Sequence, residues 1–232
     1  FFFFSSSLLL LLSPSDISLD CHDKLVFEKV YEPRDDSWLL MDCLDQDKDF
    51  LKGSSVCVEV GCGSGVITAF LGTLIESCAF FAVDINPDAC SASKNTISYN
   101  SSKLSKGNVF MYLLSDLASN LYNRLEGTVD IIVFNPPYVP TSPEELEKSK
   151  GNKIIASWAG GTDGMMVTDR FLSKVSQLLS KEGVFYLVAV KENNPAQIMT
   201  KMAKEYHLFP KIVGKKKAYN EMLYIIRFSK KK

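Results

Sequence analysis

Three acidic side chains and one amide stand near the ends of four successive apolar segments of the chain. Glu59, Asp84, Asp116 and Asn135 follow one another in this way. Carboxylates and a primary amide are groups that accept hydrogen bonds from hydroxyl, amino and amide hydrogens. If the segments are parallel strands of one sheet, their carboxyl ends meet at one edge, where ligands bind in α/β proteins. Each acid alone fits a solvated helix cap, but four such groups in succession predict a binding site.

The amide belongs to the motif Asn135-Pro136-Pro137-Tyr138, which ends the apolar run 129–134. The first proline biases Asn135 away from the helical region, and neither proline can donate a hydrogen bond to a neighbouring strand, so the strand ends here. The Asn135 side chain and the Pro136 carbonyl can then accept two hydrogens, while Tyr138 offers a flat face. This arrangement predicts a clamp for a planar amide or amine. The alternative is a strand followed by a proline-rich loop, in which the asparagine only forms a turn.

A glycine-rich loop, Gly61-x-Gly63-x-Gly65, separates an apolar segment from a predicted helix. Such a loop lets a cofactor approach the backbone closely, but its spacing differs from the G-x-G-x-x-G of nicotinamide-binding folds. Glu59 precedes the first glycine by two residues. A carboxylate there would repel a pyrophosphate and attract an ammonium or sulfonium group.

The two aspartates suit the other parts of a nucleoside. Asp84, at the end of the second segment, can accept hydrogen bonds from both ribose hydroxyls, as acids in this position do. Asp116, which Leu117 follows, can accept from an adenine amino group. Together with the glycine loop, these residues predict a site for a nucleoside-containing cofactor with a cationic end.

The elements that must position these residues alternate along the chain. The predicted strands are 54–60, 78–83, 109–114, 129–134, 183–190 and 223–228, and the predicted helices are 66–75, 88–99, 118–125, 168–179 and 198–206. Alternation of strand and helix indicates a parallel, doubly wound α/β sheet. The polar stretch 141–153 is expected to be a long loop over the site that binds substrate.

A further helix is expected before the sheet. Glu32-Pro33 opens it, and Asp35 and Asp36 fall in its first turn, where the helix dipole favours carboxylates. We expect Tyr31 and Ser37 to face whatever binds at the strand ends, although the pattern fits an ordinary capped amphipathic helix equally well. Residues 1–29 are expected to be a disordered extension, and residues 30–232 a single domain.

Composition limits the remaining classes of function. The chain has 232 residues, of which 46% are hydrophobic, enough for a full core. A net charge of −1 gives no footprint for non-specific binding to nucleic acid, and the apolar run in residues 1–12 is too short to span a bilayer. Six cysteines without a CxxC pair, accompanied by two histidines, suggest no metal site. They are typical of reduced thiols in an intracellular protein.

The motifs carry a family resemblance. EVGCGSG, the acid at Asp84, Ser115-Asp116 and NPPY occur in the order of a class I S-adenosylmethionine-dependent methyltransferase. The segments YEPRDDSWLL, FNPPYVPTSPEE, ASWAGGTDG and VKENNP resemble the eukaryotic and archaeal HemK-like glutamine methyltransferases. The helix start of that family usually reads Pro-Ala-Glu-Asp-Thr, and this chain departs from it, although Ser37 keeps the hydroxyl.

The resemblance implies a seven-stranded, mostly parallel sheet with an antiparallel last strand, and S-adenosylmethionine as cofactor. The cofactor-binding residues implied are Ser37, Glu59, Gly61, Gly63, Asp84, Asp116, Leu117 and Asn135. Asn135, Pro136 and Tyr138 would be catalytic, and Pro137 and Tyr31 would also contact the substrate. That substrate would be the glutamine of the Gly-Gly-Gln motif in a class I translation termination factor. We expect the chain to be cytoplasmic, with the nucleus as a second compartment.

A partner is expected at the segment 109–114. It should form a sheet edge, yet it carries no charge, proline or bulge of the kind that normally blunts edges. An open apolar edge invites a second chain, unless a helix of the same chain covers it. The resemblance implies a small zinc-binding activator subunit there. Methylation of an adenine amine or a lysine, and an inactive cofactor-binding subunit, remain alternatives; neither a membrane nor direct nucleic-acid binding is expected.

Overall fold

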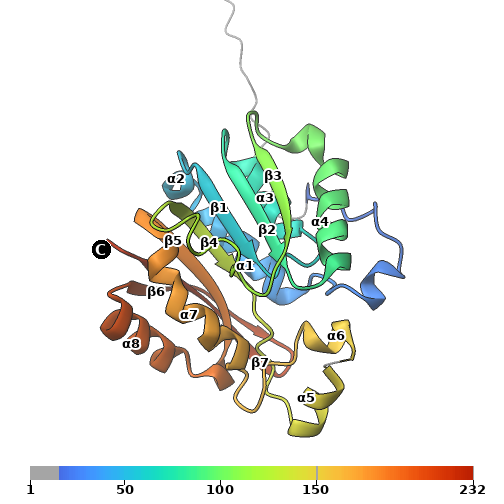
Figure 1. Ribbon diagram of the computed structural model, residues 1–232, viewed down its shortest axis with the longest axis vertical. Coiled ribbons are helices and arrows are strands. Elements are labelled where there is room, and N and C mark those ends of the chain that lie inside the picture. Colours follow the sequence, from blue (N-terminus) through green and yellow to red (C-terminus); the bar gives the residue numbers. More distant parts are fainter. Residues whose placement is uncertain (1–15, 150, 232) are drawn as a thin grey trace, which may run out of the picture.

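A single mixed sheet forms the middle layer of the computed structural model, which describes residues 16–149 and 151–231 (Figure 1). The seven strands run in the order β3-β2-β1-β4-β5-β7-β6. Their bounds are β1 (Val56–Val60), β2 (Ala79–Asp84), β3 (Val109–Leu114), β4 (Val129–Phe134), β5 (Leu179–Val190), β6 (Phe209–Ala218) and β7 (Glu221–Ser229). β1 therefore lies between β2 and β4, at the point where the strand order reverses.

Helices connect the strands. They are α1 (Asp35–Gln46), α2 (Lys48–Leu51), α3 (Val66–Leu74), α4 (Pro87–Tyr99), α5 (Pro143–Ser149), α6 (Lys153–Ala156), α7 (Met166–Leu178) and α8 (Pro195–Tyr206), with short 3-10 turns η2 (Val26–Glu28), η3 (Ser101–Lys103) and η4 (Lys191–Asn193). None of the helices within the described residues is both long and apolar enough to cross a bilayer.

The strand directions confirm the predicted fold class. β1 pairs in parallel with β2 and β4, β3 with β2, and β5 with β4, whereas β7 is antiparallel to both β5 and β6. The last strand is thus the antiparallel one. β6 was absent from the strands predicted by pattern, because its sequence FPKIVGKKKA replaces the apolar alternation of a strand with lysines.

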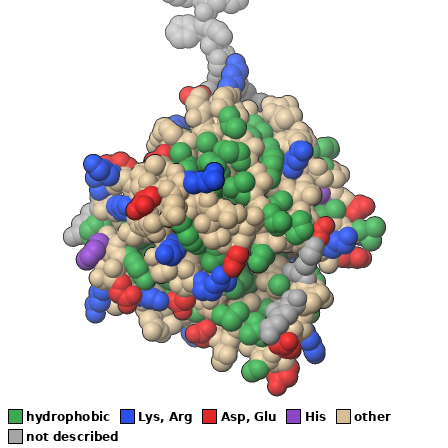
Figure 2. Space-filling view, viewed as in Figure 1, with side chains coloured by type: hydrophobic (Ala, Val, Ile, Leu, Met, Phe, Trp, Pro, Cys, Tyr) green, Lys and Arg blue, Asp and Glu red, His purple; other side chains and the backbone are tan. Residues whose placement is uncertain are grey.

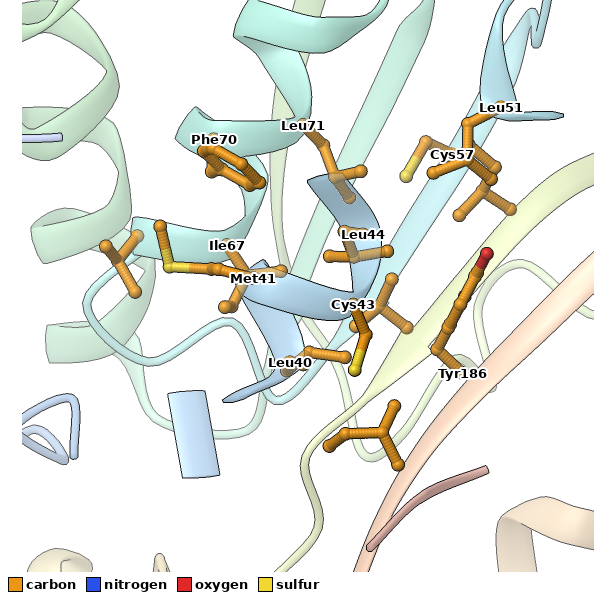
Figure 3. Packing of buried hydrophobic residues seen from close by; sticks show 14 of the residues in the cluster. Leu40, Met41, Cys43, Leu44, Leu51, Cys57, Ile67, Phe70, Leu71 and Tyr186 are labelled. Carbon is orange, nitrogen blue, oxygen red and sulfur yellow. The ribbon is translucent and has the colours of Figure 1, made fainter. Parts of the chain in front are cut away.

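Two apolar cores bury the two faces of the sheet. α1, α3 and α4 cover one face, and α7 and α8 cover the other. Figure 3 shows the first core from close by, with side chains of α1 and α3 packed together beside Tyr186 of β5. The helices on both faces leave the carboxyl ends of β1, β2 and β4 as a shared rim.

The N-terminal segment contradicts one expectation. Residues 16–29 were expected to be disordered, but they lie along α4. Ser18 exchanges hydrogen bonds with the Asn100 side chain, its N–H donating at 3.0 Å and its carbonyl accepting at 2.8 Å. His22 contacts Thr96 at 2.8 Å, and Ile17 is buried in the first core. Residues 1–15 of the expected extension lie outside the described residues.

Two other local expectations are wrong. The segment 118–125 forms successive turns rather than the predicted helix, since hydrogen bonds between residues three apart recur along it, as from Leu121 N to Ala118 O at 2.9 Å. The segment 141–153 contains α5 rather than only loop. Ser142 and Glu145 form a reciprocal capping box there, with Pro143 at the first helical position.

The two edges of the sheet differ sharply. Within the described residues, β3 pairs only with β2, and Val109 and Leu114 at its ends are exposed. Hydrophobic side chains gather on the surface over this part of the sheet (Figure 2). β6, at the opposite edge, has all three blunting features: a proline, a bulge between Ile212 and Gly214, and four exposed lysines at 211, 215, 216 and 217.

Candidate active site

The glycine loop is held against the end of β2. The N–H groups of Gly61 and Cys62 both donate to the Val83 carbonyl, at 2.8 and 3.0 Å. Gly61 and Gly63 have φ of +72° and +50°, a region that residues with a Cβ rarely adopt. A Cβ on Gly63 would meet nothing within 4 Å, so the loop presents bare backbone to open space. This is the cradle that a closely approaching cofactor needs.

Asp84 faces this loop from the end of β2. Its Oδ2 accepts from Gly63 N at 3.1 Å, and its Oδ1 accepts from Asn86 N at 2.8 Å. Burial raises the pKa of Asp84 above its usual range, although the backbone hydrogen bonds lower it. The carboxylate therefore fixes the glycine loop from the position where the sequence predicts a ribose contact.

Glu59 is more deeply placed than expected. It is 4% exposed, and its Oε2 accepts from the N–H of Thr68 at 2.9 Å and from the Thr68 hydroxyl. Burial raises the pKa of Glu59 to about 8, with a further increase from Asp84, while the Thr68 hydrogen bonds oppose the shift. Glu59 thus ties β1 to the first turns of α3. A cationic group nearby would favour its ionised form.

Asp116 lies at the rim but is engaged. Arg170 of α7 donates to its Oδ2 at 2.5 Å, in an ion pair where both side chains are about half exposed. Leu117, the next residue, has φ of +53°, which is strained for a residue with a branched side chain. The structure therefore brings Asp116 and Leu117 to the same rim as Asp84, with an arginine beside the carboxylate.

The NPPY loop is supported from behind by the segment 158–164. Val139 N donates to the Trp158 carbonyl at 3.0 Å, and Gly160 N donates to the Val139 carbonyl at 2.8 Å. A Cβ on Gly160 would lie 2.6 Å from the Pro137 carbonyl oxygen, so the two backbones touch. The NPPY loop is thus packed against the segment with the sequence ASWAGGTDG.

The main side chains expected to bind substrate lie together. Asn135 Nδ2 and the Tyr138 and Tyr31 hydroxyls all donate to one carboxylate, that of Asp36. Ser37 lies beside them, with its N–H donating to the same residue at 2.7 Å. Among the described residues, Asn135 Oδ1 is one of four buried side-chain polar atoms without a hydrogen-bond partner. An acceptor in that state is ready for an incoming N–H group.

Asp36 is the residue that sequence reasoning missed. It was assigned only to the helix dipole, yet it is 3% exposed and joins Tyr31, Asn135 and Tyr138. The available signal was its place in the YEPRDDS segment, directly between the tyrosine and the serine predicted to face the site. No group of three or more histidine, cysteine, aspartate or glutamate side chains suited to a metal ion occurs among residues 16–149 and 151–231.

These features fit S-adenosylmethionine, the cofactor that the motifs imply. The open backbone at Gly63 gives room for close approach, and the acids on the rim suit its hydroxyl, amino and cationic groups. The orphan Asn135 Oδ1 stands apart from them, on the NPPY loop, as an acceptor for a second molecule.

Known proteins place these residues in a family. The family model described as Methyltransferase small domain matches residues 32–159. The chain is 43% identical to Methyltransferase HEMK2 of Mus musculus over 88% of this chain and 91% of that protein. It is 38% identical to the eRF1 methyltransferase catalytic subunit mtq2 of Schizosaccharomyces pombe, over 87% and 89% respectively.

A solved structure agrees with this relationship. The chain superposes with a TM-score of 0.63 and 25% identity on a structure of the E. cuniculi Mtq2-Trm112 complex, covering 87% of this chain and 99% of that one. That complex is described as responsible for the methylation of the eRF1 translation termination factor. The glycine loop, the acids at the strand ends and the NPPY loop all lie within residues 32–159, which the family model matches. The chain belongs to the HemK-like glutamine methyltransferases.

Proposed function

We propose that this chain is the catalytic subunit of a heterodimer that transfers the methyl group of S-adenosylmethionine to the side-chain nitrogen (N5) of glutamine. The target is the glutamine of the Gly-Gly-Gln motif in a class I translation termination factor. The observation that carries the proposal is the buried, unpartnered Oδ1 of Asn135 beside Tyr138. The similarity to HEMK2 and to mtq2 supports the same substrate.

The cofactor would lie along the rim. Gly61 and Gly63 would let it approach the backbone, Asp84 would accept from its ribose hydroxyls, and Asp116 and Leu117 would contact its base. Glu59 would face its cationic end, and Ser37 and Asn135 would complete the site. When bound, S-adenosylmethionine supplies a methyl group on a sulfonium sulfur, which is an electrophile.

The clamp addresses the weakness of an amide as a nucleophile. The lone pair of an amide nitrogen is delocalised, so the nitrogen reacts slowly in solution. Asn135 Oδ1 and the Pro136 carbonyl would accept its two hydrogens, which raises the electron density on the nitrogen and fixes its direction. Pro137 and Tyr138 would hold the amide plane, with Tyr31 at the side. Orientation of this kind can supply effective molarities of about 10⁵ M or more.

No strong base is required. Transfer of the methyl group would break the methyl–sulfur bond, leave a neutral thioether and place a positive charge on the amide nitrogen. That cationic nitrogen loses a proton readily to water, so the clamp needs only to accept hydrogen bonds. Burial and the negative charge of Asp36 raise the pKa of Tyr138 well above its usual range, so this tyrosine stays protonated. It therefore acts as a rigid flat wall and a hydrogen-bond donor rather than as a base.

The partner would dock at β3. In the part of the chain that the structure describes, this edge pairs on one side only, and its exposed ends Val109 and Leu114 extend the apolar surface of the strand. The complex of Mtq2 with Trm112 supports a small subunit in this role, and the resemblance implies that the subunit binds zinc. All six cysteines of this chain are free thiols, which supports a reducing compartment, the cytoplasm with the nucleus as a second site.

A methyl-transfer assay tests the proposal. The chain, co-expressed with the small subunit, is offered termination factor, the same factor with Gly-Gly-Ala in place of Gly-Gly-Gln, DNA and histone. We expect methylation of the unaltered termination factor alone, since the clamp is proposed to bind a glutamine side chain as the group that receives the methyl. Methylation of adenine in DNA or of lysine would replace the proposal with one of the alternatives, because both amines present N–H groups to the same clamp.

A further inference from the structure

A carboxylate is buried behind the clamp. Asp36 is 3% exposed and sits in the first turn of α1, and no lysine or arginine among the described side chains forms an ion pair with it. Its neighbour Asp35, in contrast, is a partly exposed residue that pairs with Lys216 at 2.7 Å. A buried carboxylate without a cation must be satisfied by hydrogen-bond donors. The identity of those donors therefore indicates what Asp36 does.

Every recorded partner of Asp36 is a donor. Oδ1 accepts from the N–H of Ser37 at 2.7 Å and from its hydroxyl at 3.3 Å. Oδ2 accepts from Asn135 Nδ2 at 2.9 Å, from the Tyr138 hydroxyl at 3.0 Å and from the Tyr31 hydroxyl at 3.1 Å. Burial raises the pKa of both tyrosines, so both hydroxyls keep the proton that they donate. Asp36 thus joins three substrate-facing side chains.

This contact fixes the direction of the Asn135 amide. An asparagine side chain has an oxygen end and an NH2 end of nearly the same shape, and packing alone distinguishes them poorly. A carboxylate oxygen can only accept, so the NH2 end must face Asp36. The oxygen end must then face the other way, and it is this Oδ1 that is buried without a partner.

We propose that Asp36 is a positioning residue that orients the Asn135 amide, so that its Oδ1 is presented to the substrate N–H. The inference deepens the proposed function and rests on it for the identity of that substrate. The charge of Asp36 also polarises the Asn135 amide through Nδ2, which makes Oδ1 a stronger acceptor. The same carboxylate holds the hydroxyls of Tyr31 and Tyr138 on either side.

The variant Asp36→Asn tests the inference, since it keeps the size of the side chain and removes its charge. An asparagine at 36 can donate as well as accept, so it tolerates a flipped Asn135. We expect kcat for methylation to fall about 10²-fold, the size of effect caused by a small misplacement of a reacting group, with KM and cofactor Kd within about twofold. Asp35→Asn is the matched control, one residue away in the same helical turn, and should retain the parental kcat.

A double-mutant cycle separates positioning from a general structural role. If Asp36 acts through Asn135, adding Asp36→Asn to Asn135→Ala should lower kcat by less than about twofold. A combined loss equal to the product of the single losses would overturn the inference. The inference would also be overturned if Asp36→Asn weakened cofactor binding by the same factor as kcat and lowered the melting temperature as well.

A nuclear magnetic resonance measurement needs no substrate. The Asn135 side-chain N–H signals are identified by their absence from Asn135→Ala. In the parent chain, the hydrogen bond to Asp36 should shift one N–H downfield and slow its exchange with water. Asp36→Asn should reduce both effects, because an amide oxygen is a weaker acceptor than a carboxylate. Unchanged signals in Asp36→Asn would overturn the inference. If the parent chain fails to methylate termination factor, the proposed function fails, while these signals still decide whether Asp36 orients Asn135.

Discussion

The Asn193 side chain donates from Nδ2 to the Tyr138 carbonyl at 3.0 Å, across 55 residues of sequence. The same Nδ2 donates to the Asp163 carbonyl at 3.2 Å, and Asn193 Oδ1 accepts from Val190 N at 2.9 Å. One buried amide from the KENNP segment therefore joins the end of β5, the NPPY loop and the loop before α7. These contacts hold the NPPY loop, which we propose as the clamp, in a fixed position.

Gly164→Ala should damage this support. A Cβ at this residue would overlap the Tyr138 carbonyl oxygen and lie 2.5 Å from Asn193 Nδ2, and φ is +71°. Gly127→Ala is the matched control, because φ there is +67° but nothing lies within 4 Å of the new Cβ. We expect the control to lose about 1–2 kcal/mol from its backbone conformation alone. Gly164→Ala should lose more and lower turnover as well, as urea unfolding and initial rates will measure. Equal losses in the two variants would contradict the clash.

Asn135→Ala should separate binding from turnover. Its Oδ1 has no partner within the described part of the chain and points to the substrate side in our proposal. Loss of one oriented hydrogen-bonding group at a reacting centre costs about 10²–10³-fold in rate, so we expect at least that fall in methyl incorporation. Cofactor affinity, measured by calorimetry, should stay within a few-fold. Near-normal turnover would show that the clamp is not the reacting centre.

Asp84→Asn should weaken cofactor binding. The substitution keeps the shape of the side chain but removes the charge that would strengthen hydrogen bonds from the ribose. Each charge-assisted hydrogen bond contributes about 1.5–3 kcal/mol, so we expect the cofactor Kd to rise about 10-fold or more. Calorimetric titration measures the change, and thermal melting checks that the Gly63 loop remains folded. An unchanged Kd would show that Asp84 only holds the glycine loop in place and does not contact the cofactor.

Glu59 should make stability depend on pH. Its pKa is about 8 in the folded chain, against 4.5 for an ordinary glutamate. The folded state therefore binds more protons than the unfolded state between these values, and its stability falls as pH rises from about 4.5 to 8. Glu59→Gln should lose this dependence while still accepting from Thr68. Urea unfolding at pH 5 and pH 8 tests the sign, and parallel pH profiles of the two proteins would contradict it.

Met111→Lys should disrupt the proposed docking edge. A lysine in the middle of β3 adds charge to the apolar strand, and loss of a central contact in an interface weakens binding about 30-fold or more. Ile212→Lys is the control, since it adds the same charge to β6 at the opposite edge, where Ile212 is 42% exposed. We expect the isolated chain to be poorly soluble and weakly active. The small subunit should raise solubility and activity in the parent chain and in Ile212→Lys, but not in Met111→Lys. A monodisperse, fully active isolated chain that tolerates Met111→Lys would remove the partner from this edge.

The sequence predicted the layered sheet because buried strands and amphipathic helices alternate strongly. It failed where local chemistry was weak or was overlooked. β6 was absent from the pattern because lysines take the place of apolar residues, and the capping box of Ser142 and Glu145 was overlooked within a polar stretch. The segment 118–125 has helical composition, but its hydrogen bonds are those of turns.

Some residues of the site could also be predicted from the sequence, and others could not. Glu59, Asp84 and Asn135 could be found because each ends a strand, and strand ends of a parallel sheet converge. Asp36 could not be found by this rule, since it lies on a helix and its partner Asn135 is 99 residues away. Spacing along the chain carries no information about such a pair. The surroundings of Glu59 were unpredictable for the same reason, because Thr68 reaches it from the following helix.

The unequal edges of the sheet also limit how excess copies of the chain can associate. Pairing through β3 on two copies uses the open edge of each and leaves the lysine-bearing β6 strands outermost. A contact that joins the same surface on both copies closes on itself, whereas fibre growth needs a second, different contact surface on every copy. Association of the isolated chain through β3 should therefore give two-fold symmetric pairs as the unit of its aggregates, and not fibres. Self-association and partner binding would then compete for the same strand, β3, so added partner subunit should release chains from such a dimer.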